Sequence, residues 1–271
     1  MKGCPAGALR YTTDMRRLLP TLSTEIEIED VYRDLEFPEP PAGRPYIYLN
    51  FVSTVDGQVT LGSGGAAGIG SKLDHRLMGR LRVTADALLH GASTVRKDNF
   101  PPQVPADLED ERIARGLARQ PFGAVITRSG DITPDNRYFS RPGSVILTTN
   151  RQVARLASLF GDRAIVLGCG ENTVDLGSAL GALRERFGVR TLLCEGGPAL
   201  THDLVAEGLL DEIFLTLAPK LGSDKGALRL LEGPAFDPAA LPQLELLQVL
   251  AEGSELFLRY RLPATPVALA R

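Results

Sequence analysis

The sequence predicts an α/β fold of three layers, in which helices cover both faces of a mostly parallel sheet. Short runs of β-forming residues alternate with segments of helical periodicity from residue 46 to residue 217, as in chains whose parallel strands are joined by helices. Near the C-terminus, two β-rich runs over 244–250 and 255–262 flank the turn 251–254. They predict an antiparallel hairpin that closes one edge of the sheet.

The first 43 residues are predicted to be an N-terminal arm. An acidic lead is followed by the run Phe37-Pro38-Glu39-Pro40-Pro41, and prolines favour extended chain. We expect a short helix near residues 28–35 within this arm. Residues 44–263 are then expected to form one α/β domain, and residues 264–271 a tail.

The domain is predicted to begin with a strand and a helix. Residues 46–52 are rich in β-forming side chains and lead towards the small-residue loop 61–68. Ser71, with Asp74 three residues later, forms a capping box, and leucines recur after it at helical spacing. These features predict a helix over 72–82.

The remaining elements follow the same alternation. Residues 87–89 predict a buried strand, which the turn 91–94 and a polar loop through residue 102 follow. Runs of β-forming residues predict further strands at 123–127, 144–149, 164–167, 190–194 and 211–217. Apolar periodicity predicts helices near 150–159, 176–187 and 199–207.

The composition argues against several classes of partner. Of 271 residues, 44% are hydrophobic and 23% are charged, which is enough for a sizeable core. A net charge of −3 gives no basic field for nucleic acid, and the chain has no run of eighteen apolar residues that would predict a membrane span. Cys4, Cys169 and Cys194 show neither zinc spacing nor a disulfide pattern. We expect a cytoplasmic protein that binds a small molecule and no metal.

A strand that breaks at a carboxylate and two glycines is the most informative motif. The apolar run Leu192-Leu193-Cys194 is followed by Glu195-Gly196-Gly197-Pro198 and then by a predicted helix. Glycines let the backbone approach a ligand, and free amides at a helix start attract phosphate. Glu195 ends a strand, which is where open α/β sheets bind ligands. The motif predicts an anion site, and a tight strand-to-helix turn is the structural alternative.

Four motifs, taken together and in order, resemble one enzyme family. They are Val52-Ser53-Thr54-Val55-Asp56-Gly57, Leu81-Arg82 before a buried strand, Gly91-Ala92-Ser93-Thr94-Val95 with Asp98 close behind, and Cys194-Glu195-Gly196-Gly197-Pro198 followed by Ala218-Pro219-Lys220. Over roughly residues 44–262 the chain resembles the reductase domain of the bacterial riboflavin-biosynthesis deaminase-reductase and its stand-alone archaeal and fungal counterparts. The deaminase motifs of the bifunctional enzymes do not occur in this sequence, so we expect only the reductase half.

The resemblance implies a dihydrofolate-reductase-like fold, an NADPH cofactor and a homodimer. The implied reaction reduces a ribosylaminopyrimidine 5′-phosphate to the ribitylamino pyrimidine in riboflavin biosynthesis. Hydride passes from C4 of the nicotinamide to C1′ of the ring-opened sugar imine. The protein must therefore align two carbons and exclude water.

The resemblance also implies where the cofactor binds. It places Val52, Thr94 and Asp98 at the nicotinamide end. It places the stretch after Glu195 at the cofactor phosphates, namely Gly196, Gly197, Pro198, Ala199 and Leu200. Thr94 and Asp98 as ordinary turn residues are the structural alternative. The family's usual Asp-Asp-Pro reads Asp98-Asn99-Phe100 in this chain.

Arg82 and Glu195 are implied to face the substrate. Arg82 suits a substrate phosphate because its guanidinium is always charged and bidentate. Glu195 is the expected catalytic residue, which hydrogen-bonds the pyrimidine amino groups or helps to supply a proton. The structural alternatives are a helix-end cation for Arg82 and a helix-capping charge for Glu195.

Four further candidate residues lie at or just after predicted strand ends. Arg128 and Ser129 come after a predicted strand, where the cofactor 2′-phosphate can be held, and a surface loop is the alternative. Gly168 begins a Gly-Cys-Gly turn that lacks the third glycine of a dinucleotide fingerprint, and we place it at the adenosine end of the cofactor. His90 ends a strand where members of the family carry a small or aliphatic residue, so we expect it to line the pocket.

Two other functions remain open from the sequence. One is a related reductase of a pterin or another heterocycle without a sugar phosphate, for which Arg82 and Lys220 would be dispensable. The other is a non-enzymatic NADP-binding module, which would bind the cofactor without turnover.

Overall fold

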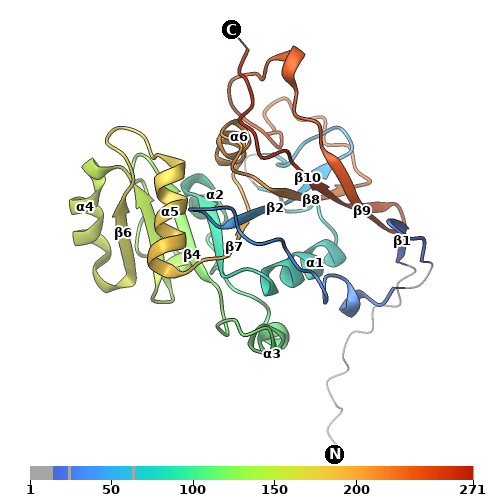
Figure 1. Cartoon of the computed structure of the whole chain (residues 1–271), viewed down its shortest axis with the longest axis horizontal. Helices are drawn as coiled ribbons and strands as arrows, with labels where there is room; N and C mark the ends of the chain where they lie inside the picture. Colours follow the sequence, from blue (N-terminus) through green and yellow to red (C-terminus); the bar gives the residue numbers. More distant parts are fainter. Residues whose placement is uncertain (1–14, 24–25, 63–64, 271) are drawn as a thin grey trace, which may run out of the picture.

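The computed structural model describes residues 15–23, 26–62 and 65–270 (Figure 1). Residues 1–14 of the expected arm, residues 63–64 of the small-residue loop and the last residue of the tail lie outside the described residues. The strands are β1 (Arg16–Leu19), β2 (Tyr46–Thr54), β3 (Ala87–Gly91), β4 (Phe122–Thr127), β5 (Ser144–Thr148), β6 (Ala164–Gly168), β7 (Thr191–Cys194), β8 (Glu212–Ala218), β9 (Glu245–Glu252) and β10 (Glu255–Arg261). The α-helices are α1 (Lys72–Val83), α2 (Ala92–Asp98), α3 (Glu109–Ala114), α4 (Asn150–Phe160), α5 (Leu176–Phe187) and α6 (Pro198–Ala206), and short 3-10 turns are η1 (Ile28–Asp30), η2 (Ala106–Leu108), η3 (Arg137–Phe139), η4 (Gly161–Arg163) and η5 (Pro238–Ala240).

All ten strands join one sheet in the order β1-β9-β10-β8-β2-β7-β3-β4-β5-β6. The pairs from β8 through β2, β7, β3, β4 and β5 to β6 are parallel. The pairs β8–β10, β10–β9 and β9–β1 are antiparallel. The predicted α/β class, with a mostly parallel sheet and an antiparallel C-terminal hairpin, is confirmed.

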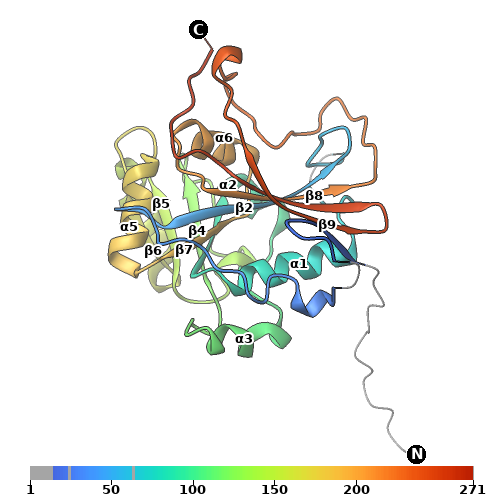
Figure 2. The ribbon, with the colours of Figure 1, turned by 45° about the vertical axis from the view of Figure 1, so that its right-hand side comes forward.

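Alternate residues of a strand pack against different helices, because successive side chains point to opposite faces. In β3, Leu89 joins the cluster formed with α5 and α6, whereas Leu88 joins Leu81 of α1. Figure 2 shows α6 on one side of the sheet and α1 on the other. The three expected layers are present.

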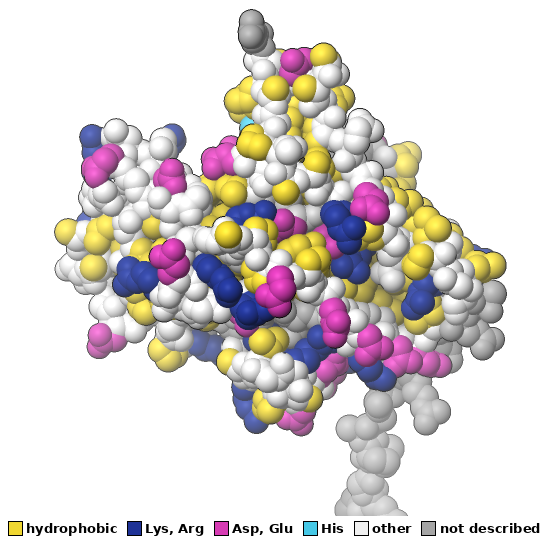
Figure 3. Space-filling view, in the orientation of Figure 1, with side chains coloured by type: hydrophobic (Ala, Val, Ile, Leu, Met, Phe, Trp, Pro, Cys, Tyr) yellow, Lys and Arg dark blue, Asp and Glu magenta, His cyan; other side chains and the backbone are white. Residues whose placement is uncertain are grey.

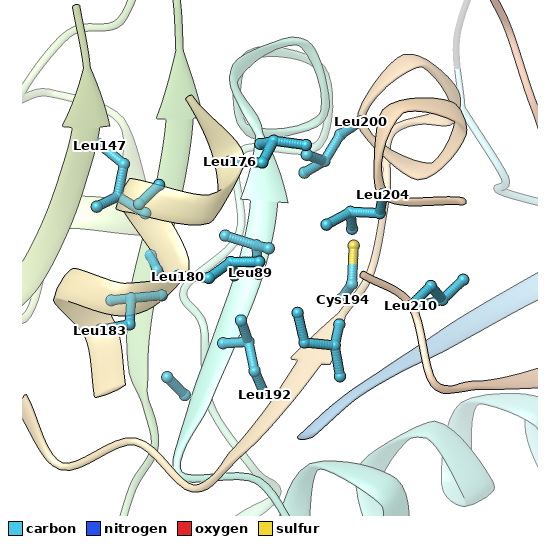
Figure 4. Packing of buried hydrophobic residues seen from close by; sticks show 14 of the residues in the cluster. Leu89, Leu147, Leu176, Leu180, Leu183, Leu192, Cys194, Leu200, Leu204 and Leu210 are labelled. Carbon is cyan, nitrogen blue, oxygen red and sulfur yellow. The ribbon is translucent and has the colours of Figure 1, made fainter. Parts of the chain in front are cut away.

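The largest core lies between the sheet and the helices α5 and α6. Figure 4 shows leucines of both helices meeting strand residues of β3 and β7; the labelled members include Leu176, Leu180, Leu183, Leu200, Leu204, Leu89, Leu192 and Cys194. Leu180, Leu183 and Leu204 have no exposed surface. This core holds the start of α6 against the ends of β3 and β7, where the motif Glu195-Gly196-Gly197-Pro198 lies.

Residues 92–98 form a helix, and the predicted turn and polar loop are wrong for this segment. Gly91 precedes the helix with extended backbone, and Asn99 ends it in the left-handed region at φ 44°. Val95 alone among its residues is buried, in a cluster with Val125 and Tyr138. Because Val95 alone is buried, the segment lacks the repeated apolar positions that predict a helix from sequence.

The predictions for the arm and for the sheet edge need correction. Of the helix expected over 28–35, only η1 forms, because Val31 adopts extended backbone and is buried with Ile28 against the sheet. β1 pairs with β9 outside the hairpin, so the arm and not the hairpin closes that edge. The division into an arm and a domain stays a prediction.

A buried arginine donates hydrogen bonds to backbone carbonyl groups at the C-terminal end of α1. Arg112 of α3 has no exposed surface, and its Nη1 donates to the backbone oxygens of Arg82, Val83 and Ala85 at 2.8, 3.2 and 2.6 Å. The last carbonyls of a helix lack intrahelical partners, and cations near them are favourable. Burial lowers the pKa of Arg112 to about 10, so it is charged at neutral pH.

We predict that Arg112→Leu lowers the free energy of unfolding by about 3 kcal/mol, because it leaves several buried carbonyls without a charged donor. Urea denaturation followed by circular dichroism measures the change. The control is Arg119→Leu, whose side chain is 60% exposed and whose loss changes stability by less than about 0.5 kcal/mol. Equal stability of the two variants would contradict this role.

Candidate active site

Strand register brings Glu195 and His90 together. Leu89 of β3 pairs with Cys194 of β7, and the Glu195 backbone amide continues this pairing by donating to the Leu89 oxygen at 3.0 Å. His90 and Glu195 therefore follow a paired position on neighbouring strands. Leu88 and Leu193, two residues earlier on the same strands, pack with Leu81 of α1. Because every second residue of a strand points to the same face, His90 and Glu195 also point to the face that α1 covers.

Arg82 of α1 forms a bidentate ion pair with Glu195. Its Nε donates to Oε1 at 2.6 Å and its Nη2 donates to Oε2 at 2.7 Å. Its Nη1 donates to the Gln103 backbone oxygen at 2.8 Å. The side chains of Arg82 and Glu195 are 11% and 8% exposed. The sequence places both at the substrate, and the structure pairs them with each other.

The ion pair keeps Glu195 ionised. Burial acts to raise the pKa of Glu195, but the charge of Arg82 and a hydrogen bond from His90 outweigh it and lower the pKa to about 2. At neutral pH the carboxylate accepts hydrogen bonds and donates none. Of the two roles considered for Glu195, hydrogen bonding to amino groups matches this state better than proton supply.

His90 lies behind Glu195 and is fully buried. Its Nε2 lies 2.9 Å from Glu195 Oε2, and its Nδ1 lies 3.0 Å from the Tyr138 hydroxyl. The ring also meets the edge of the Phe100 ring at a centroid distance of 5.1 Å. His90 is not among the residues that line the hollows described below, although we expected it to line the pocket.

A cleft of about 720 Å³ opens on the α1 face beside this cluster. Its lining combines the carboxyl end of β2, one side of α1 and the segment around α2; it includes Asn50, Val52, Asp74, Arg82, Thr94, Lys97, Asp98, Phe100 and Glu195. Partial burial raises the pKa of Asp98, against the opposing charges of His90 and Lys97. The predicted substrate residues and the predicted nicotinamide residues thus share one cleft.

A second hollow of about 430 Å³ lies on the other face of the sheet, at the start of α6. Gly197, Ala199 and Leu200 line it together with Arg128 at the end of β4. A Cβ at Gly197 would lie 3.1 Å from the Thr94 hydroxyl, so glycine permits this close approach of α6 to α2. Three of the five predicted phosphate residues thus meet Arg128 here, and Pro198 lines the smaller hollow described next.

A smaller hollow of about 90 Å³ links the two. It shares Thr94, Asp98 and Glu195 with the cleft, and Ser93 and Gly197 with the second hollow. The three form a run across the carboxyl ends of β2, β3 and β7. This edge is where open α/β sheets bind their ligands.

Three predicted cofactor residues do not line these hollows. Gly196 lies against the Phe51 ring, which a Cβ at that position would meet at 2.7 Å. The Ser129 hydroxyl accepts from the Asp131 amide at 3.3 Å within its own turn. Gly168 ends the outermost strand β6 and lies against Asn150. Lys220 donates to the backbone oxygens of Gly68 and Ile69 at 2.8 and 2.7 Å, so it braces a wall of the cleft.

Phe100 and Lys97 are site residues that sequence reasoning missed. The Arg82 guanidinium lies 5.6 Å from the centre of the Phe100 ring, a cation–π contact. Phe100 replaces the proline of the family motif, and that departure was the available signal. Lys97 lines the cleft, but nothing in the sequence separates it from a solvated lysine. Within the described ranges, no group of three or more His, Cys, Asp or Glu is arranged for a metal.

Curated proteins similar to this chain include enzymes and proteins named for riboflavin biosynthesis. The chain is 28% identical over 220 residues to the 2,5-diamino-6-ribosylamino-4(3H)-pyrimidinone 5′-phosphate reductase of Methanothermobacter thermautotrophicus, covering 80% of this chain and 98% of that protein. It is 29% identical over 196 residues to the riboflavin biosynthesis protein RibD of Escherichia coli, covering 70% of this chain and 53% of that protein. The first relative is thus matched along almost its whole length, and the second along about half.

Solved structures agree at the level of the fold. The chain superposes on RibD of Acinetobacter baumannii with a TM-score of 0.68 at 23% identity, covering 82% of this chain and 59% of that one. The family model of the RibD C-terminal domain matches residues 45–258. That range contains the cleft, the second hollow and all four sequence motifs, and the chain belongs to the RibD C-terminal domain family.

Proposed function

We propose that this chain is an NADPH-dependent reductase of riboflavin biosynthesis that acts in the cytoplasm. Its substrate is a ribosylaminopyrimidine 5′-phosphate and its product the ribitylamino pyrimidine. The observation that carries the proposal is the bidentate contact of Arg82 with the Glu195 carboxylate, beside a cleft that runs on to the start of α6. The reductase name of the archaeal relative supports the same substrate class.

Glu195 orients the pyrimidine ring in this proposal. Its Oε2 already accepts from Arg82 and His90, whereas Oε1 accepts from Arg82 alone. A carboxylate oxygen can accept two hydrogen bonds, so Oε1 retains a lone pair for an amino group. The negative charge also favours a protonated imine as it approaches hydride transfer. Arg82 acts on the substrate through Glu195, because it already makes three hydrogen bonds.

The residues present fit a dinucleotide cofactor. The backbone amides of Ala199 and Leu200 lie in the first turn of α6, where amides lack intrahelical partners, and both residues line the second hollow. A side chain at Gly197 would crowd Thr94 and fill part of this cradle. Arg128 borders the same hollow and can meet a 2′-phosphate, while Val52, Thr94 and Asp98 border the substrate cleft. When bound, the nicotinamide supplies the hydride.

We predict that Glu195→Gln lowers turnover of the pyrimidine phosphate about a hundredfold, roughly 2.7 kcal/mol in the barrier. Glutamine keeps the shape but removes the charge that holds Arg82 and favours the imine. Single-turnover absorbance of the reduced nicotinamide measures the step, and NADPH affinity by calorimetry stays close to wild type.

The control for Glu195 is Glu185→Gln on the exposed side of α5, which leaves turnover at the wild-type rate. An unaltered rate in Glu195→Gln at saturating substrate would mean that Glu195 acts only as a helix-capping charge. Wild-type protein that binds NADPH but turns over no pyrimidine phosphate would favour the NADP-binding module instead.

We predict that NADPH binds about tenfold or more tightly than NADH, because Arg128 meets the additional phosphate with charge-assisted hydrogen bonds. Arg128→Ala removes this preference by weakening NADPH and sparing NADH. Calorimetric titration with each cofactor provides the four dissociation constants. The control is Arg33→Ala, which removes an exposed cation paired with Asp30. A preference for NADPH that survives Arg128→Ala would place the site of the 2′-phosphate elsewhere.

We also propose a homodimer formed through the outer face of β8, β10 and β9. Register places apolar side chains of all three strands there, on the face opposite Phe257, and these are partly exposed: Leu215, Leu217, Leu246, Val249, Leu256 and Leu258. Figure 3 shows hydrophobic side chains gathered around the region of β9 and β1. Contiguous apolar surface of this kind is typical of subunit interfaces.

Leu246→Glu is expected to convert the dimer into monomers, because a charge would be buried at the interface. Leu246 is 38% exposed, so the monomer tolerates the change. Sedimentation velocity measures the mass of wild type and variant. Leu159→Glu, at a leucine 46% exposed on α4, is expected to remain dimeric, and a wild-type monomer would contradict the proposal.

A further inference from the structure

His90 is buried against the proposed site and has hydrogen-bond partners at both ring nitrogens. Nε2 lies 2.9 Å from Glu195 Oε2, and Nδ1 lies 3.0 Å from the Tyr138 hydroxyl. Both neighbours are themselves buried. The ring is therefore held in one orientation directly behind the carboxylate that faces the cleft.

The Glu195 contact determines the state of Nε2. An ionised carboxylate is only an acceptor, and Glu195 is ionised at neutral pH because Arg82 and His90 lower its pKa to about 2 against the effect of burial. His90 Nε2 therefore carries a hydrogen and donates it to Oε2. This bond, with the one from Arg82, leaves Oε1 as the oxygen that can serve a substrate.

The Tyr138 contact allows two states of Nδ1. Tyr138 keeps its single hydroxyl proton because burial raises its pKa well above the usual range. In neutral His90, Nδ1 accepts that proton. In charged His90, Nδ1 donates to the hydroxyl oxygen, and the hydroxyl donates to the Ala124 backbone oxygen at 3.1 Å. Each state satisfies both partners, so the contacts hold the ring in the same orientation in either state.

We propose that His90 is a positioning residue for Glu195: by hydrogen bonding from Nε2 to Oε2 at 2.9 Å, it fixes the carboxylate so that Oε1 stays available to the substrate. This inference rests on the proposed function. Turnover should therefore fall when the donor at the position of Nε2 is removed and recover when another donor is placed there.

Two amide substitutions of His90 divide its contacts. The amide of His90→Gln reaches the position of Nε2 and can donate to Glu195, but it cannot gain a proton. The amide of His90→Asn reaches only the position of Nδ1 and leaves Glu195 without this donor. We expect His90→Asn to lower kcat about tenfold and His90→Gln to recover most of that loss.

A second measurement needs no substrate. Nitrogen-15 NMR follows the ring nitrogens of the three histidines, and the signal missing from His90→Gln identifies His90. Glu195→Gln should shift the Nε2 signal of His90, because a neutral amide replaces the carboxylate that accepts from it. Asp203→Asn, next to the other buried histidine His202, should leave the His90 signal unchanged.

These measurements separate the two proposals. If wild type does not reduce the pyrimidine phosphate while Glu195→Gln still shifts His90, the proposed function fails and the positioning of Glu195 by His90 stands. If wild type is active but His90→Asn keeps the wild-type kcat, the inference is wrong. A His90 Nε2 signal that does not change in Glu195→Gln overturns it as well.

Discussion

The buried ion pair of Arg82 and Glu195 is the contact on which the rest of the site depends. Burying two charges is unfavourable unless good geometry and further hydrogen bonds compensate. Here two short N–H···O bonds join the groups, and His90 contributes a third. The pair forms only when α1 packs across β3 and β7, and Arg112 binds the carbonyls at the end of that helix. Core packing and the ion pair therefore both require α1 to lie across β3 and β7.

The two faces of the sheet have different roles in the proposed reaction. Side chains that point towards α1, such as Val52 and Glu195, border the cleft, whereas the amides of α6 border the hollow on the other face. Hydride transfer requires two ligands in contact, so the sites must meet across the strand ends. Gly197 allows this because its Cα lies against Thr94 where a side chain would not fit comfortably. The glycine is thus as important to the arrangement as the charged residues.

Capping and turn residues in the sequence correctly predicted where several helices begin and end. The Ser71 hydroxyl caps α1 by accepting from the Asp74 amide, as the capping box predicts, and Gly188 ends α5 in the left-handed region. The strand alternation also predicted the fold class. The sequence pattern did not reveal that Arg82 pairs with Glu195, 113 residues away, because strand register and helix docking decide that contact. β1 was missed for the same reason, since its partner β9 lies near the other end of the chain.

The antiparallel half of the sheet supports the site without supplying its charged cluster. Lys220 follows β8 closely and binds the Gly68 and Ile69 carbonyls, which fixes the loop before α1. At the start of that helix, Ser71 donates to Glu255 of β10 at 2.5 Å. The helix that carries Arg82 is therefore held at its first turn by the antiparallel strands and at its last turn by Arg112. Its position along the sheet, and with it the reach of Arg82 to Glu195, is set from both ends.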